Sequence, residues 1–306
     1  MQPLRGIVLK IASVLVFVSM ASIVKLISDD VPPGEIVFFR SAFAVPVILV
    51  WLIATGDIRS GIATARPLSH LWRALAGTVA MGFAFAALGL LPLPEATAIG
   101  YAAPLLTVIF AAMFLGEEVR LFRIATVALG LVGVLIVLSP RLGSFGEGGM
   151  APVEATGAMM ALVGAVFAAL AQVFIRGMVH QERTSAIVFW FSVNGALLSL
   201  VTLPWGWVLP SPGTAALLVL AGTCGGIGQV LLTSAYRFAP ASVVAPFEYA
   251  SMLLALLVGY VAFAEVPTPV VLTGAALIVL AGILIIWREH QLGLERSRQR
   301  QSAPPS

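Results

Sequence analysis

The stretch EIVFFRSAF, residues 35–43, is echoed by AIVFWFSVN at residues 186–194, and this echo decides how the chain is organised. Inside each copy the order is Ile-Val-Phe, one aromatic residue, one divergent residue and a serine. The divergent residue is Arg40 in the first copy and Phe191 in the second. The chain therefore repeats a segment and places a full charge in only one of the two copies.

The composition places this repeat in a membrane. Of the 306 residues, 60% are hydrophobic and 10% are charged, which is more apolar surface than a soluble fold of this size could bury. No run of basic residues precedes the C-terminal tail, so nucleic acid is not an expected partner. The single cysteine, Cys224, excludes an internal disulfide and suits a small packing residue.

Hydrophobic runs of about 20 residues, enough to cross a hydrocarbon core about 30 Å thick, predict ten transmembrane helices. They are helices rather than barrel strands because the runs are continuously apolar instead of alternating. The predicted spans are 7–27, 34–54, 70–90, 95–115, 121–139, 153–175, 185–204, 214–236, 241–263 and 268–287.

Lys and Arg residues gather on one side of these spans. Of the 17, we count 14 in the terminal segments and in the loops on the same side, with Arg73 in the loop after the second span. Basic loops stay in the cytoplasm, so both termini should be cytoplasmic. The sequence therefore predicts an all-α integral membrane protein of the cell inner membrane.

The two halves of the chain correspond over their length. Residues 6–41 run without a gap against 157–192, and LAGT occurs at 75–78 and again at 220–223. Because each half holds five spans, an odd number, the second copy must enter from the opposite face, as in inverted-repeat transporters. We expect one five-helix repeat over residues 1–145, an inverted second repeat over 150–290 and a disordered cytoplasmic tail over 291–306.

Prolines interrupt the fourth and ninth spans at matching places. Pro104 and Pro246 lie inside these spans, beside Tyr101 and Tyr249. Proline removes a backbone donor, and matching broken helices in two halves point to a substrate site. The alternative is proline at the first turn of an ordinary helix, and both interpretations stay open for Pro104 and Pro246.

Arg40 carries a charge about a turn and a half inside the second span. An arginine near a helix centre costs about 2.5 to 3.5 kcal/mol, so it requires compensation. It can bind an anionic group of a substrate, or it can pair with Asp29, Asp30 or Glu35 near the outer surface. Lys25, at the outer end of the first span, suits an interfacial anchor.

Glu248 is an acid inside the ninth span, for which three roles stay open. It can bind a substrate, carry a coupled proton, or pair with Arg237 at the cytoplasmic end. With Arg40 it predicts a cavity of asymmetric charge, which suits an amphoteric substrate such as an amino acid. The further polar candidates for binding, or for interhelical hydrogen bonds, are Tyr101, Asn194, Gln229 and Tyr249.

Motifs for other classes of protein are missing from the sequence. There is no Walker-type G-x-x-x-x-G-K, so ATP hydrolysis is not expected and transport should be driven by a gradient or by exchange. The histidines, His70, His180 and His290, fall in predicted loops or the tail without companion ligands, so no metal or other cofactor is expected. A membrane-embedded enzyme is the alternative from another class.

Two segments carry a family resemblance. EATAIGYAAPLLTVIFAAMFLGEEV (95–119) and AYRFAPASVVAPFEYASMLLALLVGYVAFAEVPTP (235–269) resemble the EamA-type permeases of the drug/metabolite transporter superfamily. The resemblance covers nearly the whole chain and implies a central cavity between the repeats and alternating access. It also implies substrates such as amino acids, nucleotide-like metabolites, vitamins or drugs, often exported. The glutamates that close the fourth and ninth spans match as Glu117 and Glu265.

We therefore expect an inner-membrane permease that moves a small polar or amphoteric metabolite such as an amino acid, with export favoured. Uptake of S-adenosylmethionine or of a vitamin such as riboflavin is the alternative. The expected partners are the substrate, the lipid bilayer, and protons or an exchanged metabolite. The chain should act as a monomer or a homodimer.

Overall fold

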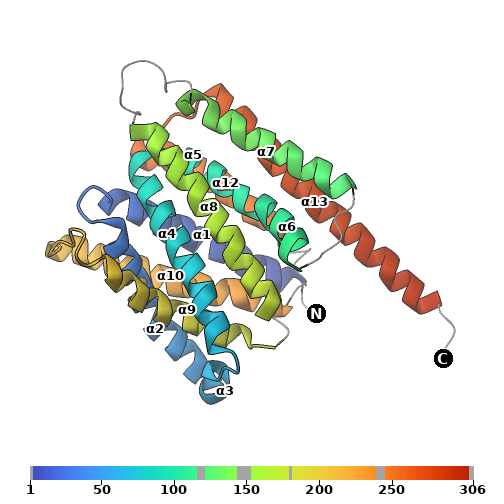
Figure 1. Cartoon of the computed structure of the whole chain (residues 1–306), viewed down its shortest axis with the longest axis horizontal. Helices are drawn as coiled ribbons and strands as arrows, with labels where there is room; N and C mark the ends of the chain where they lie inside the picture. The colour runs from blue at the N-terminus through green and yellow to red at the C-terminus, as the bar shows by residue number, and fades with distance from the viewer. Residues whose placement is uncertain (1–2, 116–120, 143–152, 179–180, 239–244, 303–306) are drawn as a thin grey trace.

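The computed structural model describes residues 3–115, 121–142, 153–178, 181–238 and 245–302, and every regular element in these ranges is a helix (Figure 1). The helices of the first half are α1 (Pro3–Ile27), α2 (Pro33–Ala54), α3 (Ile58–Ile62), α4 (Pro67–Leu90), α5 (Leu93–Gly100), α6 (Ala102–Leu115) and α7 (Leu121–Leu142). Those of the second half are α8 (Val153–Met178), α9 (Thr184–Ser199), the 3-10 turn η1 (Leu200–Thr202), α10 (Pro212–Phe238), the 3-10 helix η2 (Ala245–Tyr249), α12 (Ala250–Phe263) and α13 (Pro269–Ser302).

The helices have the length and composition of membrane spans. Within the described residues, 8 helices are long and apolar enough to cross a bilayer, and the shorter apolar helices Ile124–Pro140 and Phe247–Phe263 lie in the fifth and ninth predicted spans. Large apolar side chains such as Val50, Leu253 and Val261 are exposed on the outside of the bundle, as lipid-facing residues are. The protein is therefore an all-helical, multi-pass membrane protein.

Proline and small residues set where the helices begin and how closely they pack. Proline occupies the first turn of α2, α4 and α5, where its missing N–H has no intrahelical partner to lose. On α10, Gly222 and Gly226 lie against α2, because a Cβ at either position would come within 2.6 to 2.8 Å of α2 atoms. The glycine-rich segment of α10 thus permits close helix packing.

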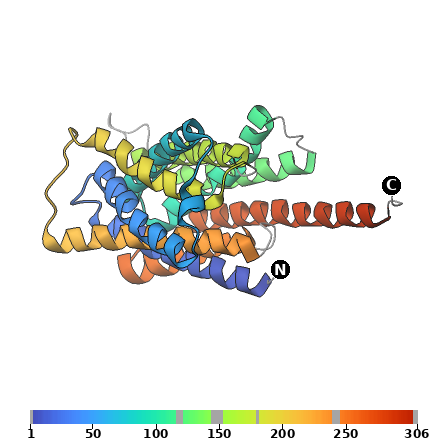
Figure 2. The ribbon, with the colours of Figure 1, turned by 90° about the horizontal axis from the view of Figure 1, so that it is seen from below.

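The helices pack in pairs that join the two halves. α4 packs along α8, α1 along α10, and α7 along α13, while α2 contacts both α9 and α10. Figures 1 and 2 show α7 beside α13, and Figure 2 shows α13 extending past the rest of the bundle toward the C-terminus. The interior between the halves is therefore built from both copies of the predicted repeat.

The last helix is longer than the sequence suggested. We predicted a disordered tail over residues 291–306, whereas α13 continues as far as Ser302. Residues 291–302 include Leu, Glu, Arg and Gln, which are strong helix formers, so the helix continues beyond the apolar segment.

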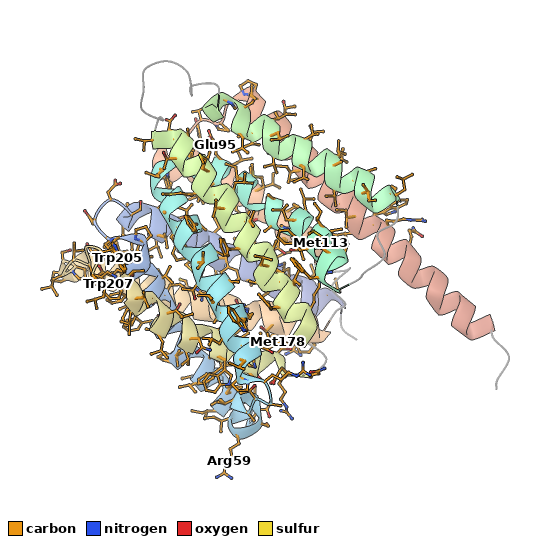
Figure 3. All side chains as sticks on the ribbon, viewed as in Figure 1. Arg59, Glu95, Met113, Met178, Trp205 and Trp207 are labelled. Atoms are coloured by element: carbon orange, nitrogen blue, oxygen red, sulfur yellow. The ribbon has the colours of Figure 1, made fainter. Side chains whose placement is uncertain are left out.

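Four labelled residues show which helix ends lie together in the bundle (Figure 3). Glu95, in the first turn of α5, and Trp205, after η1, lie toward one end of the bundle in Figure 3. Met113, near the end of α6, and Met178, the last residue of α8, lie toward the other end. The first of these is the end that the distribution of charge predicts to face outward.

Candidate functional site

The chain is interrupted at a matching place in each half. α5 ends at Gly100, Tyr101 follows it, and α6 begins at Ala102. Pro104, in the first turn of α6, has no N–H to donate to the carbonyl of Gly100, which accounts for the interruption. In the second half, η2 contains Pro246 and ends at Tyr249, where α12 begins.

The two interruptions meet inside the bundle. The rings of Tyr101 and Tyr249 have centroids 5.1 Å apart. The Tyr101 hydroxyl donates to the backbone oxygen of Glu248 at 3.2 Å and is hydrogen-bonded to the Ser251 hydroxyl. The hydroxyl of Tyr249 lies against Gly282 of α13, where any Cβ would collide with it. Three of the predicted site residues, Tyr101, Glu248 and Tyr249, are thus neighbours.

Glu248 has Lys10 as an ion partner, whereas the side chain of Arg237, one of the alternatives that the sequence offered, lies outside the described part of the structure. Lys10 Nζ of α1 lies 3.1 Å from Glu248 Oε2, and Lys10 is only 2% exposed whereas the Glu248 side chain is 53% exposed. The cause is tertiary packing, because α1 runs beside η2. Lys10 falls inside the first predicted span, and a lysine inside a span was the signal for a paired charge that sequence reasoning passed over.

Arg40 is buried on α2 and faces an aromatic ring. It is 5% exposed, and its guanidinium carbon lies 5.5 Å from the centroid of the Phe191 ring on α9. Arg73 of α4 is 8% exposed, and its guanidinium carbon lies 3.5 Å from the centroid of the same ring. Among the described residues, Nε and Nη1 of both arginines have no hydrogen-bond partner.

The acidic partners that the sequence offered for Arg40 are engaged or positioned elsewhere. Glu35 Oε2 accepts the N–H of Val208 at 3.0 Å, and Asp29 and Asp30 are exposed. Residues five apart lie about 140° from each other around a helix, so Glu35 and Arg40 do not share a face. The predicted structural ion pair is therefore not formed in the part of the chain that the structure describes.

Arg73 is a residue that sequence reasoning missed. We placed it in a cytoplasmic loop, but α4 begins at Pro67 and carries Arg73 about 9 Å into the helix. A proline at the first turn was the available signal for this earlier start. Gly77, one turn further along, leaves room for the ring, because a Cβ there would lie 2.7 Å from Phe191 Cε2.

Two hydroxyl groups extend this group of polar atoms. A Cβ at Gly195 of α9 would lie 3.0 Å from Ser41 Oγ and 3.4 Å from Thr78 Oγ1, so both hydroxyls converge on that position. Neither oxygen has a hydrogen-bond partner among the described residues. We call Arg40, Ser41, Arg73, Thr78 and Phe191 the arginine cluster.

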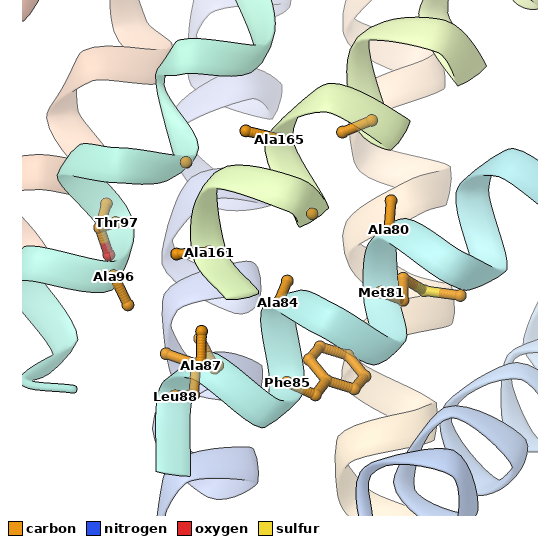
Figure 4. A pocket seen from close by; sticks show the side chains of 14 residues that line it. Ala80, Met81, Ala84, Phe85, Ala87, Leu88, Ala96, Thr97, Ala161 and Ala165 are labelled. Carbon is orange, nitrogen blue, oxygen red and sulfur yellow. The ribbon is translucent and has the colours of Figure 1, made fainter. Parts of the chain in front are cut away.

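Two cavities lie between the helices, and both are mainly apolar. The first, of about 320 Å³, lies between α1, α4, α5 and α8, and Figure 4 shows alanines of α4 and α8 around it with Thr97 of α5. The second, of about 420 Å³, is lined by residues of α2, α4, α8, α9 and η1 and includes the cluster residue Thr78. Arg40 and Glu248 do not line either cavity.

The other two predicted candidates lie apart from these groups. Asn194 on α9 and Gln229 on α10 are half-buried. No hydrogen bond or ring contact described in the structure joins either of them to the arginine cluster or to the tyrosine pair. For Asn194 and Gln229, substrate binding and interhelical hydrogen bonding therefore stay predictions from the sequence.

Polar contacts join the halves at the predicted outer end. Lys25 Nζ lies 2.9 Å from Glu265 Oε1, and Glu265 Oε2 accepts the N–H of Leu93 at 2.8 Å. Lys25 also donates to the backbone oxygen of Leu91 at 2.6 Å. Lys25 is therefore a half-buried partner of Glu265 and not the interfacial anchor that we predicted. Glu117, the matching glutamate of the fourth span, lies outside the described residues.

A second set of contacts joins the halves at the predicted cytoplasmic end. Glu182 Oε1, before α9, accepts hydrogen bonds from the Thr64 hydroxyl and from the N–H groups of Ala65 and Arg66, each at 2.9 Å. Its Oε2 lies 3.5 Å from Nε2 of His70, which is buried in α4 rather than in a loop. Burial raises the pKa of the Glu182 carboxyl, but these hydrogen bonds outweigh burial and hold the pKa below its ordinary value.

This geometry defines a class of protein: a helical membrane protein with apolar cavities between its helices and with polar contacts that join its two halves at both ends. The EamA-like transporter family model matches residues 4–139 and 155–287, so the chain belongs to the EamA-like transporter family. It is a membrane transporter, and the part of the chain that the structure describes contains no group of three or more potential metal ligands.

Named relatives span most of the chain. It is 30% identical over 287 residues to the pseudopaline exporter CntI of Pseudomonas aeruginosa, covering 92% of this chain and 95% of that protein. It is 27% identical to an S-adenosylmethionine uptake transporter of Rickettsia bellii, covering 84% of each. It is 29% identical to a riboflavin transporter of Rhizobium johnstonii, covering 84% of this chain and 82% of that protein.

A solved structure agrees with the fold. A crystal structure superposes with a TM-score of 0.65 over 92% of this chain and 95% of that chain, at 24% sequence identity. At that identity the likeness concerns the arrangement of helices alone.

Proposed function

We propose that this protein is a ten-span secondary transporter of the inner membrane, with both termini in the cytoplasm and two inverted five-helix repeats. It moves a small polar or amphoteric metabolite such as an amino acid by alternating access, with export favoured. The observation that carries the proposal is the meeting of the two interrupted helices, where the rings of Tyr101 and Tyr249 contact each other with centroids 5.1 Å apart.

The packing of helices supports a two-fold relation between the halves. If α1, α2, α4, α6 and α7 correspond to α8, α9, α10, α12 and α13, the most extensive contacts between the halves should have counterparts. α1 packs on α10 as α8 packs on α4, and α2 packs on α10 as α9 packs on α4. α1 also contacts α12 as α8 contacts α6, while α2 meets α9 and α7 meets α13 directly. This reciprocity is what a two-fold axis produces.

Individual residues repeat the same reciprocity. A Cβ at Gly133 of α7 would lie 2.8 Å from the carbonyl oxygen of Gly274, and a Cβ at Gly274 of α13 would lie 2.7 Å from that of Gly133. Arg40 and Phe191, which hold equivalent places in the repeat, also meet each other. These pairs mark the interface on which an alternating movement would occur.

The contacts at the two ends provide the parts of such a movement. Lys25 with Glu265 closes the predicted outer end, and Glu182 with residues 64–66 closes the predicted cytoplasmic end. Alternating access requires one set to open while the other holds. We propose that Glu248, which is paired with Lys10 beside the interrupted helix, carries a coupled proton, since protonation would release its ion partner.

The substrate class follows from charge. The relatives are named for pseudopaline export, S-adenosylmethionine uptake and riboflavin transport, which differ in both substrate and direction. In the arginine cluster two buried cations lack an acidic partner among the described residues, which favours a substrate with an anionic group over a purely cationic one. An amino acid satisfies this requirement through its carboxylate, and the named exporter supports export.

The test is an exchange assay with purified protein in liposomes. Vesicles are loaded with one unlabelled compound, and uptake of the same labelled compound is followed for a set of amino acids, S-adenosylmethionine and riboflavin. The proposal predicts exchange of amino acids above the level of protein-free vesicles. Exchange of S-adenosylmethionine or riboflavin alone would contradict the substrate class, and exchange of none of these compounds would contradict the proposed function.

A further inference from the structure

We infer that the arginine cluster binds a small organic dianion, with one carboxylate at Arg40 and a second at Arg73. This inference rests on the proposed function and deepens it, because it narrows the substrate to a dicarboxylic acid or an amino acid with an acidic side chain. It begins from the two buried guanidinium groups.

The other cations inside the described part of the bundle have acidic partners. The buried Lys10 is paired with Glu248, and the half-buried Lys25 is paired with Glu265. At Arg40 and Arg73, by contrast, Nε and Nη1 find no acceptor among the described residues. A buried charge without a partner is strongly unfavourable, and two like charges against one ring also repel each other. The N–H donors of the arginine cluster therefore require hydrogen-bond acceptors that the described part of the chain does not supply.

Phe191 compensates the two charges in part. An arginine over an aromatic face is stabilised by the cation–π interaction. The ring attracts the positive charge but offers no lone pairs in the guanidinium plane, so the N–H donors stay unsatisfied. A carboxylate supplies two oxygens in the geometry that a guanidinium prefers. Phe191 thus stabilises the two guanidinium charges and leaves their N–H donors available to a ligand.

The hydroxyls of Ser41 and Thr78 add donors at Gly195, one helical turn along α9 from Phe191. Both lie against Gly195 without a partner among the described residues, so they can complete the hydrogen bonding of a carboxylate. No acidic side chain belongs to the cluster, so a substrate ammonium finds no counter-charge there. One carboxylate would leave a net positive site, whereas two carboxylates would match the two guanidinium groups.

The second cavity gives a route to the cluster. Thr78 belongs to both, and Val37 lines the cavity one helical turn before Arg40 and Ser41. On α9, Ser199 lines the cavity one turn after Gly195. The helix faces that surround the cavity of about 420 Å³ therefore continue into the cluster from the end predicted to face outward.

The experiment measures binding by thermal shift of the detergent-solubilised protein. The probes are succinate and L-glutamate, with succinamide and L-glutamine as neutral isosteres and with sulfate and phosphate as inorganic dianions. Because a ligand that binds only the folded state raises its stability, the dicarboxylates should raise Tm by about 3 to 6 °C at saturation. The neutral isosteres should leave Tm unchanged.

Variants link the shift to the cluster. Arg40→Gln and Arg73→Gln should each weaken the dicarboxylates at least tenfold, whereas Arg59→Gln, which removes an exposed cation, should bind them as wild type does. Without ligand, both cluster variants should melt at or above the wild-type temperature, because each removes an unpaired buried charge. A purely structural pair of arginines predicts the opposite sign.

The outcomes separate this inference from the proposed function. Equal dicarboxylate shifts in wild type and both cluster variants, or shifts with sulfate and phosphate alone, would overturn the dicarboxylate site. If wild type and Arg73→Gln exchange a neutral amino acid equally in liposomes, the result supports the proposed transport function and contradicts the dicarboxylate site. If dicarboxylates bind through both arginines but no compound is exchanged, the result supports the dicarboxylate site and contradicts the proposed function.

Discussion

Glu182 provides a direct test of the contact that ties the halves together at the predicted cytoplasmic end. Its side chain is 2% exposed, and Oε1 accepts three hydrogen bonds of 2.9 Å, from the Thr64 hydroxyl and the N–H groups of Ala65 and Arg66. The substitution Glu182→Gln keeps an acceptor oxygen of the same shape and removes the charge. It therefore measures the strength that the charge adds to these bonds.

The size of the effect follows from the number of bonds. A hydrogen bond to a charged group contributes about 1 kcal/mol more than one between neutral groups, so three of them predict a loss of about 3 kcal/mol. For a chain of this length the loss corresponds to a decrease in Tm of about 6 °C. The control is Asp30→Asn, which neutralises an exposed carboxylate and should leave Tm unchanged.

The pH dependence of the Glu182 contribution has a definite sign. The hydrogen bonds hold the folded pKa of Glu182 below its ordinary value, so its contribution is fully present above the unfolded pKa of about 4.3. That contribution is lost as pH falls through the lower folded pKa, because both states then bind the proton. The difference in Tm between wild type and Glu182→Gln should be constant from neutral pH to about pH 5 and shrink below about pH 4.

The assay is scanning fluorimetry of purified protein in detergent, at a fixed scan rate and across this pH series. Equal melting temperatures for wild type and Glu182→Gln at neutral pH would refute the reasoning. So would a difference that grows as the pH falls.

Three further predictions concern the interface and the topology. Gly274→Ala should lower stability by about 1 to 3 kcal/mol in thermal melts, because the new Cβ would meet the Gly133 carbonyl. Gly177→Ala is the control, since open space surrounds that position and the substitution should be tolerated. Equal melting temperatures for the two variants would contradict the close approach of α7 and α13. Glu248→Gln should flatten the pH profile of exchange in liposomes, and an unaltered profile would exclude its coupling role. A reporter inserted at residue 146 should be periplasmic in cells, and a cytoplasmic signal would break the ten-span topology.

The echo at residues 35–43 and 186–194 has a structural counterpart. Arg40 and Phe191 hold equivalent places in the proposed repeat, and their side chains meet. An arginine in both copies would set two cations against each other, in addition to Arg73. With phenylalanine in the second copy, the ring faces the arginine and stabilises it. The asymmetry that the sequence displays is thus compatible with a two-fold arrangement of the helices.

The helices could be predicted from sequence because apolar length and proline position are local properties. The ion partners of charged side chains could not be predicted, because they depend on packing between segments that are distant in the sequence. Glu248 and Lys10 are 238 residues apart, and only the approach of α1 to η2 joins them. Arg73 was counted with the loop although the predicted span 70–90 already contained it, and α4 begins earlier still, at Pro67. A basic residue near the end of a predicted span therefore cannot be assigned to a loop from its charge alone.

The most direct measurement of the central claim is counterflow of labelled L-glutamate into liposomes loaded with unlabelled L-glutamate. We expect labelled L-glutamate to accumulate transiently with wild type and with Arg59→Gln. At equal amounts of reconstituted protein, this accumulation should be lost with Arg40→Gln and with Arg73→Gln. Accumulation at the wild-type rate in both cluster variants would contradict the claim that the substrate passes through the arginine cluster. So would the absence of accumulation with wild-type protein.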